Sequence, residues 1–275
     1  MIERLCRGLT LALFAYIGTA FFAKPELIQV LKATFIPTVR FDRQFLATLV
    51  AILGSMISPY LYFWQASQEV EEEKNMGRTR LWQRQGASDA ELRGRTWDVR
   101  SGVFFAVVVA YFVMLTTGAT LFQSGQTEFL STADAARALR PLAGNAAPLL
   151  LAVGLVGSGL LAVPVLTGSA AYAVAEAIGW RGSFDETPGR AKQFYVVIAL
   201  SALSGMLINF VGVNPIQALF WAGVINGLLA PPLLVIIMCI ANEKAIMGDR
   251  TNTRSLNISG WVTAGVMSAA AIGLV

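Results

Sequence analysis

Seven apolar segments, each near the length needed to cross a bilayer, constrain this chain more than any other feature. A transmembrane helix needs about 20 predominantly apolar residues. The segments cover residues 7–23, 45–67, 102–122, 146–177, 194–213, 216–241 and 256–275. Hydrophobic residues make up 55% of the 275-residue chain and charged residues only 14%, whereas roughly 25% is usual in soluble domains. The sequence therefore predicts an all-α membrane protein with seven transmembrane helices in one integral membrane domain, residues 1–275.

The distribution of basic residues predicts how the chain is oriented. Cytosolic connections of membrane proteins carry an excess of Lys and Arg. With the N-terminus in the cytosol, fifteen basic residues fall in cytosolic segments and six in outer segments. We therefore expect a multi-pass protein of the cell (plasma) membrane with a cytosolic N-terminus and an outer C-terminus. The excess of basic residues behind the net charge of +4 then anchors this orientation in the lipid bilayer, the expected partner, and indicates no nucleic-acid partner.

The residue types in the chain argue against an enzyme and against a bound cofactor. Histidine is absent, and neither a spaced carboxylate pair within the spans nor a phosphate-cradling glycine loop occurs. The two cysteines, Cys6 and Cys239, lie far apart and give no disulfide framework or metal-ligand spacing. No Asp or Glu lies in the middle of a predicted span. If the chain carries a divalent cation, the main carboxylate ligand lies outside these residues.

The second predicted span contains residues that interrupt a helix, near 54–60. Pro59 removes a backbone donor and clashes with the preceding turn, while Gly54, Ser55 and Ser58 tolerate unwinding. Non-helical backbone survives at membrane depth only where it is buried in protein or lines a wet cavity. Two interpretations stay open at this point: a simple proline kink, and a broken helix whose carbonyl end coordinates a cation.

An acidic run follows the broken span, and a few polar residues lie in the other spans. Glu69 and residues 71–73 are acidic, and they either draw cations through an inner vestibule or are solvated charges balanced by Lys74 and Arg78. Thr117 and Asn226 are candidates for interhelical hydrogen bonds or for a transport pathway.

Two pairs of small residues have the spacing of close helix contacts. Gly223 and Gly227 form one pair, and Ser201 and Gly205 form the other. Small residues four positions apart lie on the same face of a helix and let two backbones approach. We therefore predict that each pair packs against a neighbouring helix.

Four stretches of the sequence resemble the Nramp family of divalent metal transporters. They are LVAILGSMISPYLYFWQASQEVEEE, GLLAVPVLTGSAAYAVAEAIGW, NPIQALFWAGVINGLLAPPLLVIIMCIANEKAIMG and LNISGW, in the family's order. The resemblance implies a LeuT-like fold, in which the seven spans are the last helix of the first inverted repeat, the complete second repeat and an eleventh helix. It also implies that this chain is the C-terminal portion of a transporter. Its partner would be a missing N-terminal half that carries the family's Asp-Pro-Gly-Asn motif.

The resemblance also implies a site at the break, although the chain departs from the family's Met-Pro-His motif. Ser58 stands at the position of the metal-binding methionine, Pro59 matches, Tyr60 replaces the histidine, and Gln65 replaces a second histidine. The carbonyl of Ser55 corresponds to a further metal ligand. A hydroxyl in place of a thioether suits hard ions such as Mg²⁺ or Mn²⁺. The implied metal ligands are thus Ser55 and Ser58. The residues implied to line the pathway or to lie behind the ligands are Pro59, Tyr60, Gln65, Glu69, Thr117 and Asn226.

The function expected from the resemblance is secondary transport of a divalent metal cation. Two other interpretations remain. A LeuT-like carrier of amino acids or other organic solutes would also use broken helices. A non-transporting, truncated membrane subunit would account for the missing carboxylate.

Overall fold

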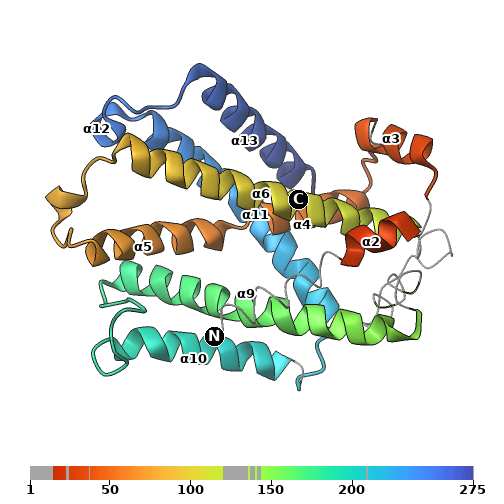
Figure 1. Cartoon of the computed structure of the whole chain (residues 1–275), viewed down its shortest axis with the longest axis horizontal. Helices are drawn as coiled ribbons and strands as arrows, with labels where there is room; N and C mark the ends of the chain where they lie inside the picture. Colours follow the sequence, from red (N-terminus) through yellow and green to blue (C-terminus); the bar gives the residue numbers. More distant parts are fainter. Residues whose placement is uncertain are drawn as a thin grey trace. The chain divides into compact units, whose positions relative to one another are not determined.

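The computed structural model is built from helices, and it describes residues 15–22, 25–36, 38–119, 136, 140, 144–208 and 210–274. No strand occurs in these ranges. Figure 1 shows the helices along the chain: α2 Ala15–Phe22, α3 Leu27–Phe35, α4 Arg43–Met56, α5 Pro59–Asn75, η2 Leu81–Arg84, α6 Asp89–Thr117, η4 Gly144–Ala146, α9 Ala147–Ile178, α10 Lys192–Ile208, α11 Pro215–Asn242, α12 Lys244–Met247 and α13 Arg254–Leu274.

In the part of the chain that the structure describes, five helical stretches are long and apolar enough to cross a membrane. They are Arg43–Asn75, Asp89–Thr117, Gly144–Ile178, Pro215–Asn242 and Arg254–Leu274. The α-helical class and the membrane-spanning character predicted from the sequence are therefore confirmed, whereas the count of seven spans stays a prediction. Most of the first predicted span lies outside the described residues. The fifth predicted span, residues 194–213, overlaps α10, which has 17 residues and is about 26 Å long.

The chain divides into two compact units. One contains residues 1–38 and 87–164, and the other contains residues 39–86 and 165–275. Helix α9 runs through the boundary, which falls next to Pro164 inside the helix. Because Pro164 lacks a backbone N–H, it breaks the regular hydrogen-bond ladder at this point.

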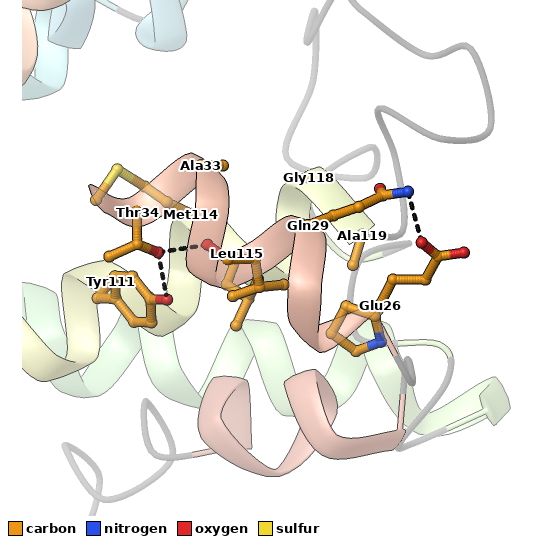
Figure 2. A pocket seen from close by; sticks show the side chains of 11 residues that line it. Glu26, Gln29, Ala33, Thr34, Tyr111, Met114, Leu115, Gly118 and Ala119 are labelled. Atoms are coloured by element: carbon orange, nitrogen blue, oxygen red, sulfur yellow. Dashed lines mark hydrogen bonds between the residues drawn. The ribbon is translucent and has the colours of Figure 1, made fainter. Parts of the chain in front are cut away.

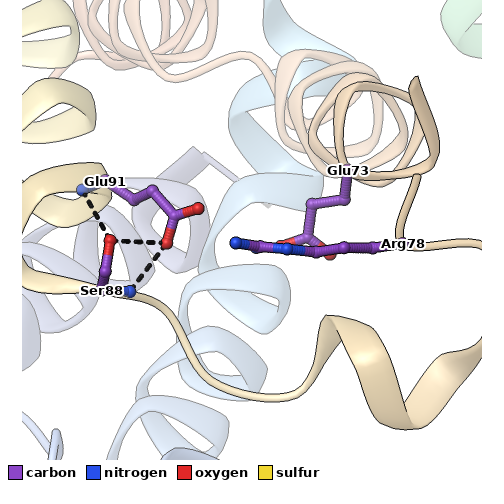
Figure 3. A network of polar contacts seen from close by, with 4 residues as sticks. All are labelled: Glu73, Arg78, Ser88 and Glu91. Carbon is purple, nitrogen blue, oxygen red and sulfur yellow. Dashed lines mark hydrogen bonds and ion pairs between the residues drawn. The ribbon is translucent and has the colours of Figure 1, made fainter. Parts of the chain in front are cut away.

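In the first unit, α2 and α3 pack against α6. The rings of Phe21 and Phe112 lie 6.2 Å apart, and the hydroxyls of Thr34 and Tyr111 lie 3.0 Å apart. The start of α6 is fixed by a capping box: the Glu91 amide donates to the Ser88 hydroxyl, and the Ser88 amide donates to the Glu91 carboxylate at 2.7 Å (Figure 3). Such a box satisfies amide groups that an exposed helix start would leave unpaired.

In the second unit, α11 packs on both α4 and α13. Their shared core contains four buried residues, Val50, Ala51, Val224 and Ala270. Small side chains at these contacts let the helix axes approach closely, as is usual for helices packed in a membrane. This group of three helices holds the first half of the interrupted span.

A separate aromatic cluster in the same unit joins α5, the C-terminal part of α9, and α10. Tyr172 and Phe194 are buried, with ring centroids 4.9 Å apart, and Trp64 and Phe184 pack edge-on to Tyr172. The end of α9 brings Phe184 into this cluster. Gly179 has a φ of +77° and reverses the chain there, and the Trp180 amide donates to the Ala175 carbonyl at 2.8 Å, which is the Schellman type of helix ending.

Candidate functional site

The interruption of the second span lies at Ile57 and Ser58. Helix α4 ends at Met56 and α5 begins at Pro59. Ser58 has φ −84° and ψ 118°, the extended backbone that a residue preceding proline favours. Pro59 occupies the first position of α5, where its missing N–H costs no hydrogen bond. The sequence therefore forms two half-helices joined by a short non-helical step.

Ser58 lies at the centre of this step and is 3% exposed. The carbonyl oxygens of Gly54 and Ser55 each lie 3.1 Å from its hydroxyl oxygen, which can donate its single proton to either one. The hydroxyl of Ser55 donates to the Ala51 carbonyl at 2.8 Å. These oxygens lie at the C-terminal end of α4, where the helix dipole concentrates partial negative charge. The oxygen donors gathered here suit a hard cation.

The spacing of α4 and α11 beside the break depends on glycines. A Cβ atom added to Gly54 would come closer than 3.0 Å to backbone atoms of both Gly223 and Gly227. A Cβ atom added to Gly223 would lie 2.9 Å from the Ala51 carbonyl and 3.0 Å from the Ser55 hydroxyl oxygen. The close contact predicted for Gly223 and Gly227 is thus present. Gly205, by contrast, has no described atom of a neighbouring helix within 4 Å of where its Cβ would lie. The helix contact predicted for the Ser201/Gly205 pair is therefore absent at Gly205 among the described residues.

The other residues predicted for the site lie at different distances from the break. Tyr60 is in the first turn of α5, and its carbonyl accepts a hydrogen bond from the Ser169 hydroxyl at 2.5 Å. Gln65 is exposed on α5, about 10 Å along the helix from Ser58, and Glu69 is partly buried one turn further.

Asn226 and Thr117 belong to other helices. Asn226 is partly buried on α11, in the turn between Gly223 and Gly227. Thr117 belongs to the other compact unit, and its hydroxyl donates to the Val113 carbonyl of its own helix at 2.7 Å. The structure therefore brings Ser55, Ser58, Pro59 and Tyr60 together at the break.

No cluster of three or more His, Cys, Asp or Glu residues that could hold a metal occurs in the described part of the chain. Oxygen atoms of hydroxyls and backbone carbonyls are the donors that the break itself provides. A divalent cation loses much of its hydration only where a carboxylate compensates. The break is thus suited to be one side of a cation site whose carboxylate comes from elsewhere.

The acidic run at the end of α5 divides into residues with different environments. Glu71 is 7% exposed, and its carboxylate accepts a hydrogen bond from the Tyr172 hydroxyl at 2.5 Å. Glu73 is partly exposed and pairs with Arg78 at 3.6 Å (Figure 3). The pairing expected for Arg78 is therefore present for Glu73, whereas Glu71 points into the protein.

Sequence reasoning did not select for the site three residues that form the contact between α5 and α9: Glu71 of α5, and Ser169 and Tyr172 of α9. Two signals were available. Ser169, Tyr172 and Glu176 recur every three or four residues, so they lie on one face of α9. Glu71 lies three residues after Gln68, whose amide is 3.5 Å from the Glu71 carboxylate. Neither signal identifies the partner helix.

The first unit contains a pocket of about 530 Å³ between α3 and α6 (Figure 2). Its polar wall includes Thr34, whose hydroxyl lies 3.0 Å from that of Tyr111, and Gln29, whose amide donates to Glu26 at 2.6 Å. Its other lining residues are mostly apolar. None of the residues predicted for the metal site lines this pocket.

Comparison with known proteins gives one family over the whole chain. The family model described as natural resistance-associated macrophage protein-like (Nramp) matches residues 1–275. The chain is similar to the divalent metal cation transporter MntH of Klebsiella pneumoniae (strain 342), with 25% identity over 272 residues. This match covers 97% of the chain and 59% of the relative, so the chain spans about three fifths of the length of that curated protein. The chain belongs to the Nramp family.

Proposed function

We propose that this chain is part of a secondary transporter that carries a divalent metal cation across the cell membrane. The observation that carries the proposal is the break at Ile57–Ser58, where hydroxyl and carbonyl oxygens gather at the negative end of α4. Family membership supports it, since the similar Klebsiella protein is named as a divalent metal cation transporter. The role is that of a carrier, in which the metal is the substrate and no catalysis is involved.

The proposal includes a complementary half of the protein. The chain covers 59% of the length of its relative, and the described residues hold no carboxylate-rich metal cluster. We infer that the chain is the C-terminal portion of a transporter with a LeuT-like fold and that the N-terminal half supplies the Asp-Pro-Gly-Asn motif. The seven spans then form one membrane domain, with the N-terminus of this chain in the cytosol and its C-terminus outside.

The proposed ligands from this chain are the Ser58 hydroxyl and the Ser55 carbonyl, with Pro59, Tyr60, Gln65, Glu69, Thr117 and Asn226 along the pathway or behind the ligands. A hydroxyl oxygen is a hard donor, while a thioether sulfur prefers softer transition metals. We therefore infer a preference for Mg²⁺ or Mn²⁺ over Cd²⁺. Ser58 is buried, and this supports the inferred metal preference, because an ion that has lost its hydration water would contact the donor atom of a buried side chain directly.

The test is metal uptake by the complete protein in proteoliposomes, with Mn²⁺, Mg²⁺ and Cd²⁺ measured separately. Ser58→Met should raise the Cd²⁺-to-Mn²⁺ uptake ratio by about tenfold, which corresponds to roughly 1.4 kcal/mol. Ser204→Met is the matched control, because Ser204 is exposed on α10 and bonds only to Leu200 of its own helix among the described residues. Equal ratios in the wild type and Ser58→Met would remove Ser58 from the site. Uptake of an amino acid and of no metal would favour the organic-solute carrier, and absence of any uptake would favour a non-transporting subunit.

A further inference from the structure

We propose that Tyr172 and Glu71 are positioning residues of the broken-helix site. Their hydrogen bond holds α5 against α9, whereas α4 packs on α11. The two half-helices can then turn relative to each other at Ile57 and Ser58. The inference rests on the proposed transport function, because it assigns to these residues the task of holding α5, and with it Ser58, in the geometry that binds the metal.

Hydrogen bonds join α5 to α9, and to the segment after α9, from the first turn of α5 to its last residue. In Figure 1, α5 runs alongside the C-terminal part of α9. The bonds are Ser169 to the Tyr60 carbonyl at 2.5 Å, Ser67 to Glu176 at 3.3 Å, Tyr172 to Glu71 at 2.5 Å, and Asn75 to Asp185 at 2.9 Å. Contacts distributed in this way hold the direction of a helix as well as its position.

The bond between Tyr172 and Glu71 is the strongest candidate among them. Glu71 is 7% exposed, and a buried carboxylate is costly unless donors surround it. Tyr172 donates its hydroxyl to one carboxylate oxygen, and the Gln68 amide lies 3.5 Å from the other and 3.4 Å from the Tyr172 oxygen. Charge-assisted hydrogen bonds are about twice as strong as neutral ones. Movement of α5 away from α9 would therefore leave the Glu71 carboxylate without its main donor.

Helix α4 is held by a different neighbour. Gly54 packs against the backbone of Gly223 and Gly227 of α11 with no room for a Cβ atom. Between the two half-helices, the link is the extended backbone at Ile57 and Ser58, with the Ser58 hydroxyl close to the last carbonyls of α4. Helix α5 also touches α11, but its hydrogen bonds described above run to α9 and to the segment after it. A joint between two helices held by different contacts is the kind of place where a few backbone dihedrals absorb a change of direction.

Tyr172→Phe isolates the hydroxyl, because the ring keeps its packing against Trp64, Phe184 and Phe194. In proteoliposomes with the complete protein, we expect the KM for Mn²⁺ uptake to rise about fivefold, the equivalent of one hydrogen bond, while Vmax changes less than about twofold. Glu71→Gln keeps an oxygen that accepts from Tyr172 but loses the charge that strengthens the bond, so its KM should lie between those of the wild type and Tyr172→Phe.

Tyr195→Phe is the matched control. It makes the same chemical change in the same aromatic cluster, but the Tyr195 hydroxyl donates to the Glu186 carbonyl at 3.0 Å, outside α5. We expect its KM to be unchanged. An unchanged KM in Tyr172→Phe would overturn the positioning role, and so would an equal fall in Vmax in both variants, because that pattern indicates a general loss of folded protein.

Hydrogen–deuterium exchange tests, without a transport assay, whether Tyr172 and Ser169 hold α5 in place. Tyr172→Phe and Ser169→Ala should each speed amide exchange in α5 and leave exchange in α4 unchanged, while Tyr195→Phe should affect neither half-helix. Equal acceleration in α4 and α5, or no change in α5, would overturn the inference. If the wild-type complete protein takes up none of Mn²⁺, Mg²⁺ and Cd²⁺, the proposed function fails. Faster exchange confined to α5 in the Tyr172→Phe and Ser169→Ala variants would still show that these residues hold α5 and not α4.

Discussion

Gly54 of α4 packs against the backbone of Gly227 of α11 so closely that a Cβ atom on Gly54 would overlap it. Gly227 in turn lies against Val50, whose backbone carbonyl and side chain occupy the space where a Gly227 Cβ would be. We predict that Gly227→Ala lowers the free energy of unfolding by about 1–3 kcal/mol, because the helices must separate to admit the methyl group. Denaturant unfolding in detergent, followed by circular dichroism, measures this loss.

Gly205→Ala is the matched control for that substitution. Gly205 also lies inside a helix, α10, but nothing in the described part of the chain is within 4 Å of its Cβ position. Because alanine is a better helix former than glycine by up to about 1 kcal/mol, stability should stay the same or rise. Equal losses in the two variants would contradict the assignment of close backbone packing to the α4–α11 contact.

Ser58→Ala tests whether the Ser58 hydroxyl contributes to the proposed metal site and to the local structure. Removal of the hydroxyl leaves the Gly54 and Ser55 carbonyls without this donor, at a cost of about 1 kcal/mol in the free energy of unfolding. We also expect weaker Mn²⁺ uptake, seen as a higher KM in proteoliposomes with the complete protein. Ser58→Thr keeps the hydroxyl and should recover most of the affinity. Identical KM values for the Ala and Thr variants would count against a ligand role for Ser58.

Local sequence was sufficient to predict where the second span is interrupted. Pro59 disfavours helical backbone at the residue before it, and the neighbouring small residues favour unwinding, so the position follows from a few adjacent residues. The close-packed face of α11 was predicted for a similar reason, since the spacing of Gly223 and Gly227 places them on one face. In both cases the signal is contained within about one or two helical turns.

Contacts between distant residues were not predictable in this way. Glu71 and Tyr172 are separated by 101 residues, and Glu71 lies in an acidic run that resembles a solvated surface. Its burial depends on where α9 packs, and neither the spacing of charges in α5 nor the polar face of α9 specifies that partner. The same holds for Gly54, whose role as the partner of Gly227 depends on the register of α4 against α11.

The Glu73–Arg78 ion pair should contribute little to stability, in contrast to the buried Glu71. The charged atoms are 3.6 Å apart, and both side chains are about a quarter to a third exposed. Exposed pairs of this kind are typically worth less than about 1 kcal/mol. A double-mutant cycle with Glu73→Gln and Arg78→Gln should therefore give a coupling energy in that range, which falls further as salt is added. A salt-independent coupling well above this value would show that the pair is more rigid and less solvated than its exposure indicates.

Asn226 can be assigned to packing or to the metal pathway by separating stability from transport. It lies in the turn between Gly223 and Gly227, and its side chain forms no hydrogen bond with the described residues. Interhelical hydrogen bonds of such residues are typically worth about 0.6–2 kcal/mol. Because this bond is absent here, Asn226→Leu should change the free energy of unfolding by less than about 0.5 kcal/mol, while raising the KM for Mn²⁺ uptake severalfold in the complete protein.

Asn242→Leu provides the opposite pattern on the same helix. The Asn242 amide donates to the Met238 carbonyl at 2.7 Å near the end of α11, so its loss should lower stability by about 1 kcal/mol and leave the KM unchanged. If Asn226→Leu instead behaves like Asn242→Leu, the amide acts in helix packing within the complete protein. A rise in KM without a loss of stability would support a place for Asn226 along the path of the ion, because the substitution would then weaken metal uptake while leaving the fold intact.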